Sequence, residues 1–146
     1  MCIRDRCNTF IIADLDKAIA LLDGKTVTDG RASKVAAMAL KARQLLYAAS
    51  DLHDATAVKA ASSVIGGFAN LNLFASSGDR AAKWTAAKNA AKAVLDAAAG
   101  YKLNLSAPAS PEEGTANYLS IAMGGKSAIG DAAASSELLF QRTHTA

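Results

Sequence analysis

Two long segments of this chain, residues 31–50 and 79–99, are rich in alanine and contain neither proline nor glycine. Alanine, leucine, lysine, methionine and arginine lose the least free energy on entering a helix. An uninterrupted run of them predicts a helix, so we expect helices over residues 33–50 and 79–99. A shorter helix is predicted over residues 14–23, where apolar side chains recur at helical spacing.

Each long helix has a candidate N-cap residue, whose side chain accepts a hydrogen bond from a free backbone N–H of the first turn. Ser33 can cap the first helix, with Thr28 and Asp29 as alternatives, and Asp79 can cap the second. Gly100 stands where the second helix would need a residue of left-handed conformation at its C-terminal end.

The apolar side chains of both helices recur at steps of three and four residues, which predicts one buried stripe on each helix. The first stripe comprises Ala32, Val35, Ala36, Ala39, Ala42 and Leu46. The second comprises Trp84, Ala87, Ala91, Val94, Leu95 and Ala98. Alanine on a contact stripe lets two helix backbones approach closely, as in antiparallel pairs and tetratricopeptide-type repeats. The sequence therefore predicts an all-α, tetratricopeptide-like helical-repeat scaffold, with long loops and an irregular C-terminal tail.

The composition agrees with a helix-rich single domain, because 51% of the 146 residues are hydrophobic and only 5% are aromatic. The formal net charge is only +3, and the lysines are scattered along the helices. A nucleic-acid-binding protein would gather them into a basic patch, so no nucleic acid is expected as a partner. No stretch is long and apolar enough to cross a bilayer.

Residues 1–7 fit neither a helix cap nor a secretory signal. Met1 to Arg6 resemble a leader that recurs in translated metagenomic assemblies as a sequencing-adapter remnant, so we expect residues 1–7 to be non-native. Both cysteines, Cys2 and Cys7, lie in this leader and therefore predict neither a disulfide nor a metal site.

Four segments, in order, resemble segments of one protein family. The run from Gly30 to Ser50 resembles the family's opening helix, and Asp14 to Ile19 resembles the helix before it. Lys83 to Leu103 resembles the next helix and its exit, and Ser136 to Arg142 resembles a later apolar segment. The family is that of the SusD/RagB proteins, which are outer-membrane nutrient-binding lipoproteins. The resemblance identifies residues 8–146 as part of a SusD-like helical domain, and it implies an internal fragment.

The resemblance implies a function and partners. The intact protein would be exposed at the surface of the outer membrane and would pass an oligosaccharide or another nutrient to a TonB-dependent, SusC-like transporter. It would be attached to the membrane only through a lipid anchor missing from this chain. In the family the glycan site is built by aromatic loops that project from the scaffold. The alternative function is an intracellular helical-repeat adaptor that binds other proteins.

Aromatic side chains are the candidate ligand contacts, because an aromatic face suits the apolar face of a pyranose. Tyr101 follows a predicted helix and Tyr118 lies in a segment, residues 100–135, that is expected to be rich in loops; both are weak candidates for ligand binding. Trp84 lies on the predicted alanine stripe and is expected to anchor the core.

Two motifs could indicate a binding site, but each also has an ordinary structural interpretation. Gly124 to Ser127 ends like a phosphate-binding loop, but Ser120 stands where that motif requires glycine, which favours an ordinary loop. If the segment did bind phosphate, Lys126 would be the lysine of a nucleotide-hydrolase site. His53 lies between Asp51 and Asp54 without the spacing of a ligand set, which favours a solvated helix exit. We expect no catalytic residue, no metal and no cofactor, and the protein is not predicted to be an enzyme.

Overall fold

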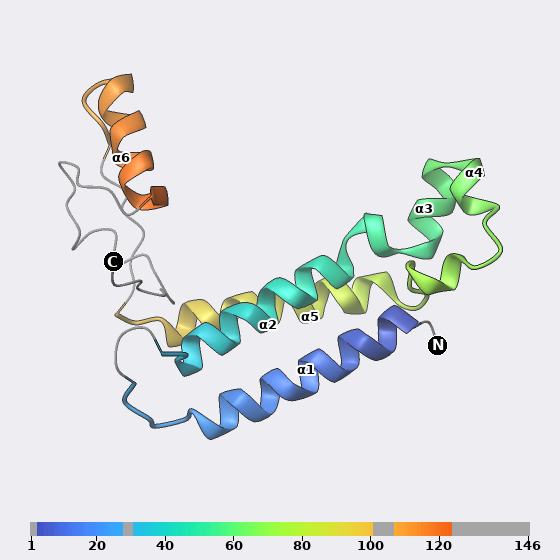
Figure 1. Cartoon of the computed structure of the whole chain (residues 1–146), viewed down its shortest axis with the longest axis horizontal. Helices are drawn as coiled ribbons and strands as arrows, with labels where there is room; N and C mark the ends of the chain where they lie inside the picture. Colours follow the sequence, from blue (N-terminus) through green and yellow to red (C-terminus); the bar gives the residue numbers. More distant parts are fainter. Residues whose placement is uncertain (1–2, 28–30, 101–106, 124–146) are drawn as a thin grey trace, which may run out of the picture. The chain divides into compact units, whose positions relative to one another are not determined.

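The structure is a computed structural model that describes residues 3–27, 31–100 and 107–123 (Figure 1). Its main helices are α1 (Ile3–Leu21), α2 (Lys34–Ala49), α5 (Arg80–Ala97) and α6 (Pro111–Met123). Its short helices are α3 (Ala55–Ala61), α4 (Ser63–Gly66) and the 3-10 turns η1 (Asp51–His53) and η2 (Leu71–Leu73). The described residues form no strand, so the all-α class is confirmed. The repeat character stays a prediction.

The chain divides into two compact units. Unit 1 comprises residues 1–27 and 32–97 and therefore holds every helix from α1 to α5. Unit 2 comprises residues 28–31 and 98–146, and α6 is its described helix.

The predicted helices 33–50 and 79–99 are confirmed as α2 and α5, together with their N-caps. The Ser33 hydroxyl accepts a hydrogen bond from the Ala36 amide at 3.1 Å. The Asp79 carboxylate accepts one from the Ala82 amide, also at 3.1 Å. Each cap satisfies an amide that has no partner within the helix itself.

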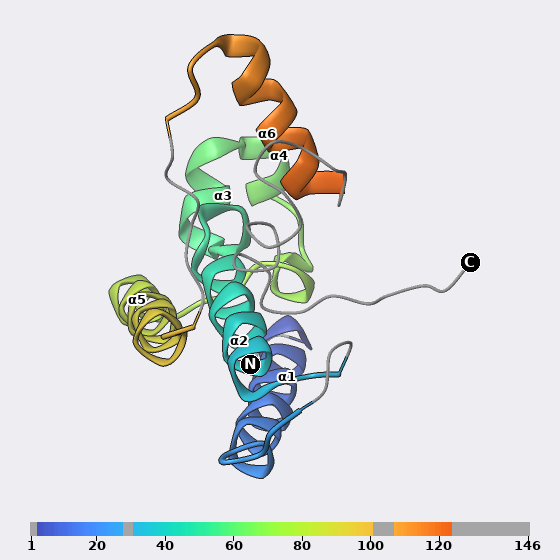
Figure 2. The same cartoon turned by 90° about the vertical axis from the view of Figure 1, so that its left-hand side faces the viewer.

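Helix α2 is the centre of unit 1. Both α1 and α5 pack along it, and Figure 2 shows α2 between the other two. The residues buried along this layer are small: Ala49 on α2 is 1% exposed, and Ala87 and Val94 on α5 are 3% and 9% exposed. Small side chains at the contact let the helix axes approach closely. The predicted close packing of alanine-rich helices is therefore confirmed for this pair.

The buried stripe of α5 differs from the prediction. Its most covered positions are Lys83, Ala87, Ala90 and Val94. The predicted members Trp84 and Leu95 are 40% and 78% exposed, so Trp84 is not a core anchor. Alanine occurs on several sides of α5, and the sequence pattern alone therefore does not define which side is buried.

The end of α5 also differs from the prediction. The helix ends at Ala97, so Gly100 lies beyond the position that would require a left-handed residue. The described residues with positive φ are Gly24, at 65°, and Gly78, at 119°. Gly24 follows the end of α1, where the sequence predicted a closing glycine.

Helix α1 begins at Ile3, well before the predicted start near Asp14. Residues 3–13 contain no proline or glycine, and they extend a half-buried stripe at steps of three and four residues. This stripe comprises Asp5, Asn8, Ile12, Leu15, Ile19 and Leu22. That residues 1–7 are a non-native leader stays a prediction.

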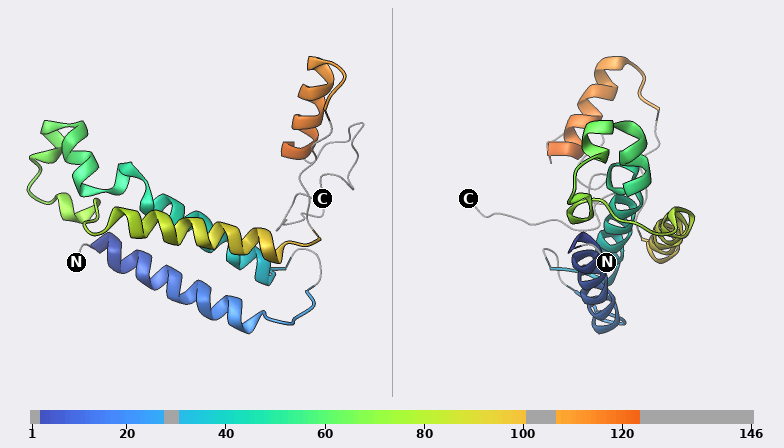
Figure 3. Two further views of the ribbon diagram at one scale, coloured as in Figure 1. Left: turned by 180° about the vertical axis from the view of Figure 1, so that it is seen from behind. Right: turned by 90° about the vertical axis from the view of Figure 1, so that its right-hand side faces the viewer.

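Residues 51–78 link the two long helices, and their glycine and asparagine content predicts a loop after one short helix. The structure of this segment is more regular than that. After η1 they form α3, α4 and η2, and the side chains of Val58, Leu71 and Ala75 form a buried cluster. Figure 3 shows α3 and α4 beyond the end of α2 and the start of α5. Asp54 caps α3, which explains why the chain resumes a helix so soon after α2.

The prediction of a loop-rich segment over residues 100–135 is wrong for Pro111–Met123, which form α6. Proline suits the first helical position because its missing N–H would have no partner there. The Ser110 hydroxyl accepts a hydrogen bond from the Glu113 amide at 3.2 Å, and the Glu113 carboxylate accepts one from the Ala109 amide at 2.6 Å. These reciprocal bonds resemble a capping box and outweigh the helix-weakening effect of Gly114.

No helix in the described ranges has both the length and the apolar character needed to cross a membrane.

The close contact between α2 and α5 is testable with two matched substitutions on α5. Ala87→Leu adds volume to a site that is 3% exposed, so we expect the free energy of unfolding to fall by about 1–3 kcal/mol. Ala93→Leu makes the same change at an exposed site and should alter it by less than about 0.5 kcal/mol. Urea unfolding followed by circular dichroism measures both, and equal losses would contradict the packing described.

Candidate functional site

A network of hydrogen bonds joins the segment after α2 to the segment before α5. The backbone of Ser76 donates to the His53 carbonyl at 2.7 Å, and the Ala55 amide donates to the Ser76 carbonyl at 2.9 Å. These bonds form an isolated parallel bridge between Asp54 and Ser76. Two segments that are distant in the sequence are therefore held side by side.

Asp54 is the buried carboxylate of this network, since it is only 5% exposed. One of its oxygens accepts hydrogen bonds from the amides of Thr56 and Ala57, each at 3.0 Å. These are free amides at the N-terminus of α3, where a negative charge is also favoured by the helix dipole. The role of Asp54 is therefore to start α3.

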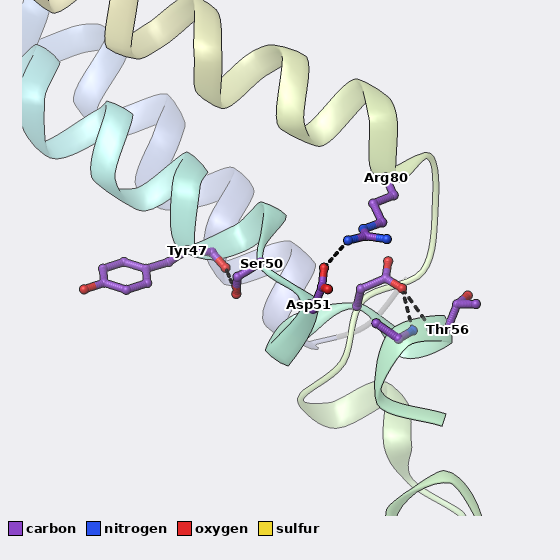
Figure 4. A network of polar contacts seen from close by, with 7 residues as sticks. Tyr47, Ser50, Asp51, Thr56 and Arg80 are labelled. Carbon is purple, nitrogen blue, oxygen red and sulfur yellow. Dashed lines mark hydrogen bonds and ion pairs between the residues drawn. The ribbon is translucent and has the colours of Figure 1, made fainter. Parts of the chain in front are cut away.

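Two cations of α5 complete the network. The Lys83 ammonium donates to the Ser76 hydroxyl at 2.7 Å and to the Ser77 carbonyl at 3.2 Å. Arg80, the first residue of α5, forms an ion pair with Asp51, as Figure 4 shows. A positive side chain at a helix N-terminus opposes the dipole, so the carboxylate of Asp51 offsets an unfavourable charge.

A cavity next to this network is lined by residues of η1, α3 and α4 and has a volume of about 510 Å³. Its lining is mostly apolar: Leu52, Ala57, Val58, Ala61, Ile65 and Phe74. The polar groups at this cavity are Arg4, Asp51, His53 and Ser62. A concave, apolar site with a few polar groups is typical of small-ligand and side-chain binding pockets.

His53 is a titratable side chain at this cavity, and the protein shifts its pKa. Burial removes water from the imidazole and lowers its pKa, and the nearby Arg4 guanidinium lowers that pKa further. The lowered pKa favours the neutral imidazole, which can both donate and accept a hydrogen bond.

The carboxylates on either side of His53 do not join it in a metal site. Asp51 is paired with Arg80, and Asp54 caps α3. The described residues contain no cluster of three histidine, cysteine or acidic side chains that could hold a metal ion. Cys7 is exposed and unpaired.

The structure describes one of the two predicted ligand-binding tyrosines. Tyr118 lies on α6 in unit 2 and is 72% exposed, whereas Tyr101 lies outside the described residues. The phosphate-loop motif of Gly124 to Ser127, with Lys126, also lies outside them. The cavity was not predicted from the sequence. Its walls come mainly from the short elements η1, α3 and α4, and no local sequence pattern indicates how these pack together. The helix-starting Asp54 could have been recognised from its position before a run of helix-forming residues.

No family model, no curated protein and no solved structure matches this chain.

The buried and exposed carboxylates should contribute differently to stability. Asp54→Ala leaves two partly buried amides without their acceptor, so we expect the free energy of unfolding to fall by about 1–2 kcal/mol. Asp51→Ala removes an exposed ion pair and should cost at most about 1 kcal/mol. Urea unfolding of the two variants measures the difference, and a smaller loss for Asp54→Ala would contradict the capping role.

The lowered pKa of His53 predicts a pH dependence of stability. The unfolded chain binds the imidazole proton more strongly than the folded chain, so the free energy of unfolding should fall as the pH drops through the ordinary histidine value of about 6.5. This loss of stability is complete once the pH lies below the pKa of His53 in the folded chain. His53→Gln should make the melting temperature depend less on pH between pH 7.5 and 5.5, a window of about one pH unit on either side of the ordinary histidine pKa. Parallel profiles for the two proteins would contradict this prediction.

Proposed function

We propose that this chain is part of a SusD-like, surface-exposed nutrient-binding protein of the outer membrane. The intact protein would pass an oligosaccharide to a TonB-dependent transporter. One observation carries the proposal. The segment that resembles the family's opening motif forms α2, the segment that resembles the next family helix forms α5, and the two helices pack together.

The chemistry of the described side chains is compatible with a binding protein. Several charged groups of unit 1 are used in caps and ion pairs, such as those of Asp54 and Asp51. Tyr118 offers an exposed aromatic ring of the kind that stacks on a sugar. These features support a scaffold that presents ligand contacts, and we propose that it performs no catalysis.

A second candidate is a helical-repeat adaptor that binds peptides. The observation that favours it is the apolar lining of the cavity beside η1 and α3, which suits an aliphatic or aromatic side chain better than a sugar. A nutrient-binding protein that takes peptides would share this chemistry. The nutrient-binding protein and the adaptor could therefore use the same pocket, and they would differ in the proteins with which they associate.

The proposed function is tested by the partners of the intact protein. The gene would be tagged in its native host and the protein purified in mild detergent, with an unrelated surface lipoprotein tagged at the same level as control. We expect a TonB-dependent transporter to co-purify in near-equal amount with the protein and to be absent from the control. Recovery without any transporter, in repeated purifications, would contradict the proposal and favour the adaptor.

A further inference from the structure

Helix α5 carries a second stripe on the side that α2 does not cover. Its members lie at steps of three and four residues, and we name this set the outer stripe: Ala81, Trp84, Lys88, Ala91 and Leu95. All five are exposed, and the two large apolar members, Trp84 and Leu95, are 40% and 78% exposed. A stripe at this spacing is what a helix presents to a neighbouring helix.

The layer of unit 1 is open on this side. Helix α2 has a neighbour on each flank, because α1 and α5 both pack along it. Helix α5 packs along α2 through a different set of residues, which includes Ala87 and Val94. Alanines on either side of Trp84 and Leu95 leave room for another helix backbone to approach.

The charge at the centre of the outer stripe is unpaired. Of the four cations on α5, Arg80 pairs with Asp51, Lys83 donates to Ser76, and Lys92 pairs with Asp96. Lys88 has no ion pair or hydrogen bond in the part of the chain that the structure describes. A partner that covers the stripe must therefore supply an acceptor for Lys88, since a buried and unpaired charge is costly.

We propose that the outer stripe docks an amphipathic helix that places a carboxylate against Lys88. Apolar side chains of this helix contact Trp84 and Leu95, and they exclude water around the ion pair. A second copy of the chain is a poorer occupant. Residue 88 is the midpoint of the stripe, so a two-fold antiparallel pair would set Lys88 against the same lysine of the other copy.

Trp84 makes the docking measurable, because it is the single tryptophan of the sequence. The probes are two designed helical peptides that share one apolar heptad stripe and differ only at its centre, with Glu in one and Lys in the other. Each is titrated into the full chain while the emission of Trp84 is recorded. We expect the Glu peptide to shift the emission to the blue and to bind about tenfold more tightly than the Lys peptide.

Three variants complete the experiment. Lys88→Glu should reverse the preference between the two peptides, and Leu95→Asp should abolish the emission shift with both. Leu21→Asp, at an exposed site on α1, is the matched control and should leave binding unchanged. All three sites are exposed, so the helix content measured by circular dichroism should be retained.

Equal binding of both peptides, or an emission that neither peptide shifts, would overturn the proposal. So would a Lys88→Glu protein that keeps the wild-type preference. The inference depends on α5 alone and not on nutrient binding. Its failure would therefore leave the co-purification test of the proposed function unaffected.

Discussion

The contact between α2 and α5 is the interaction on which the rest of unit 1 depends. It is made by small side chains, and three of the six buried apolar residues in the described part of the chain are alanines: Ala49, Ala75 and Ala87. Alanine lets two helices approach closely, but each buried methyl group contributes only about 0.8 kcal/mol. The contact is therefore closely packed but contributes little hydrophobic stabilisation. Large apolar side chains such as Leu95 lie at the surface of the layer.

Polar interactions hold the segment that links these two helices. The chain between α2 and α5 contributes a small apolar cluster around Val58, but its position is fixed by the bridge between Asp54 and Ser76. Lys83 and Arg80 bind this segment from α5, so the start of α5 and the end of α2 are stabilised together. The cavity beside His53 lies next to this polar network, and Val58 of the apolar cluster is one of its lining residues.

The sequence predicted α2 and α5 well because their signals are local. Ser33 and Asp79 are predicted as caps from their position before helix-forming runs, and the side chain of each accepts a hydrogen bond from a backbone amide of the first turn. The side of α5 that is buried could not be predicted, because alanine gives an apolar surface in nearly every direction and Trp84 biased the choice. Helix α6 was not predicted because proline and glycine usually interrupt helices, whereas Pro111 is the first residue of this helix and Gly114 lies in its first turn.

The candidate site was less predictable than the helices for a physical reason. Its hydrogen bonds join residues that are far apart in the sequence, such as Ser76 and His53, and no periodicity encodes such a pairing. Only the capping role of Asp54 is local. Residues 51–78 form short helices and turns. Such connecting segments are positioned by the elements around them, and those positions follow from tertiary packing.

The two flanks of α2 are held by different forces. Helix α1 has no buried residue and lies on α2 through a half-buried stripe, supported by the ion pair of Lys34 with Asp23 at 2.7 Å. That pair is exposed and is therefore weakened by salt. Helix α5 is held by buried contacts at Ala87 and Val94, which salt does not screen. Burial therefore stabilises the contact of α2 with α5, whereas exposed polar contacts contribute more to the contact of α2 with α1.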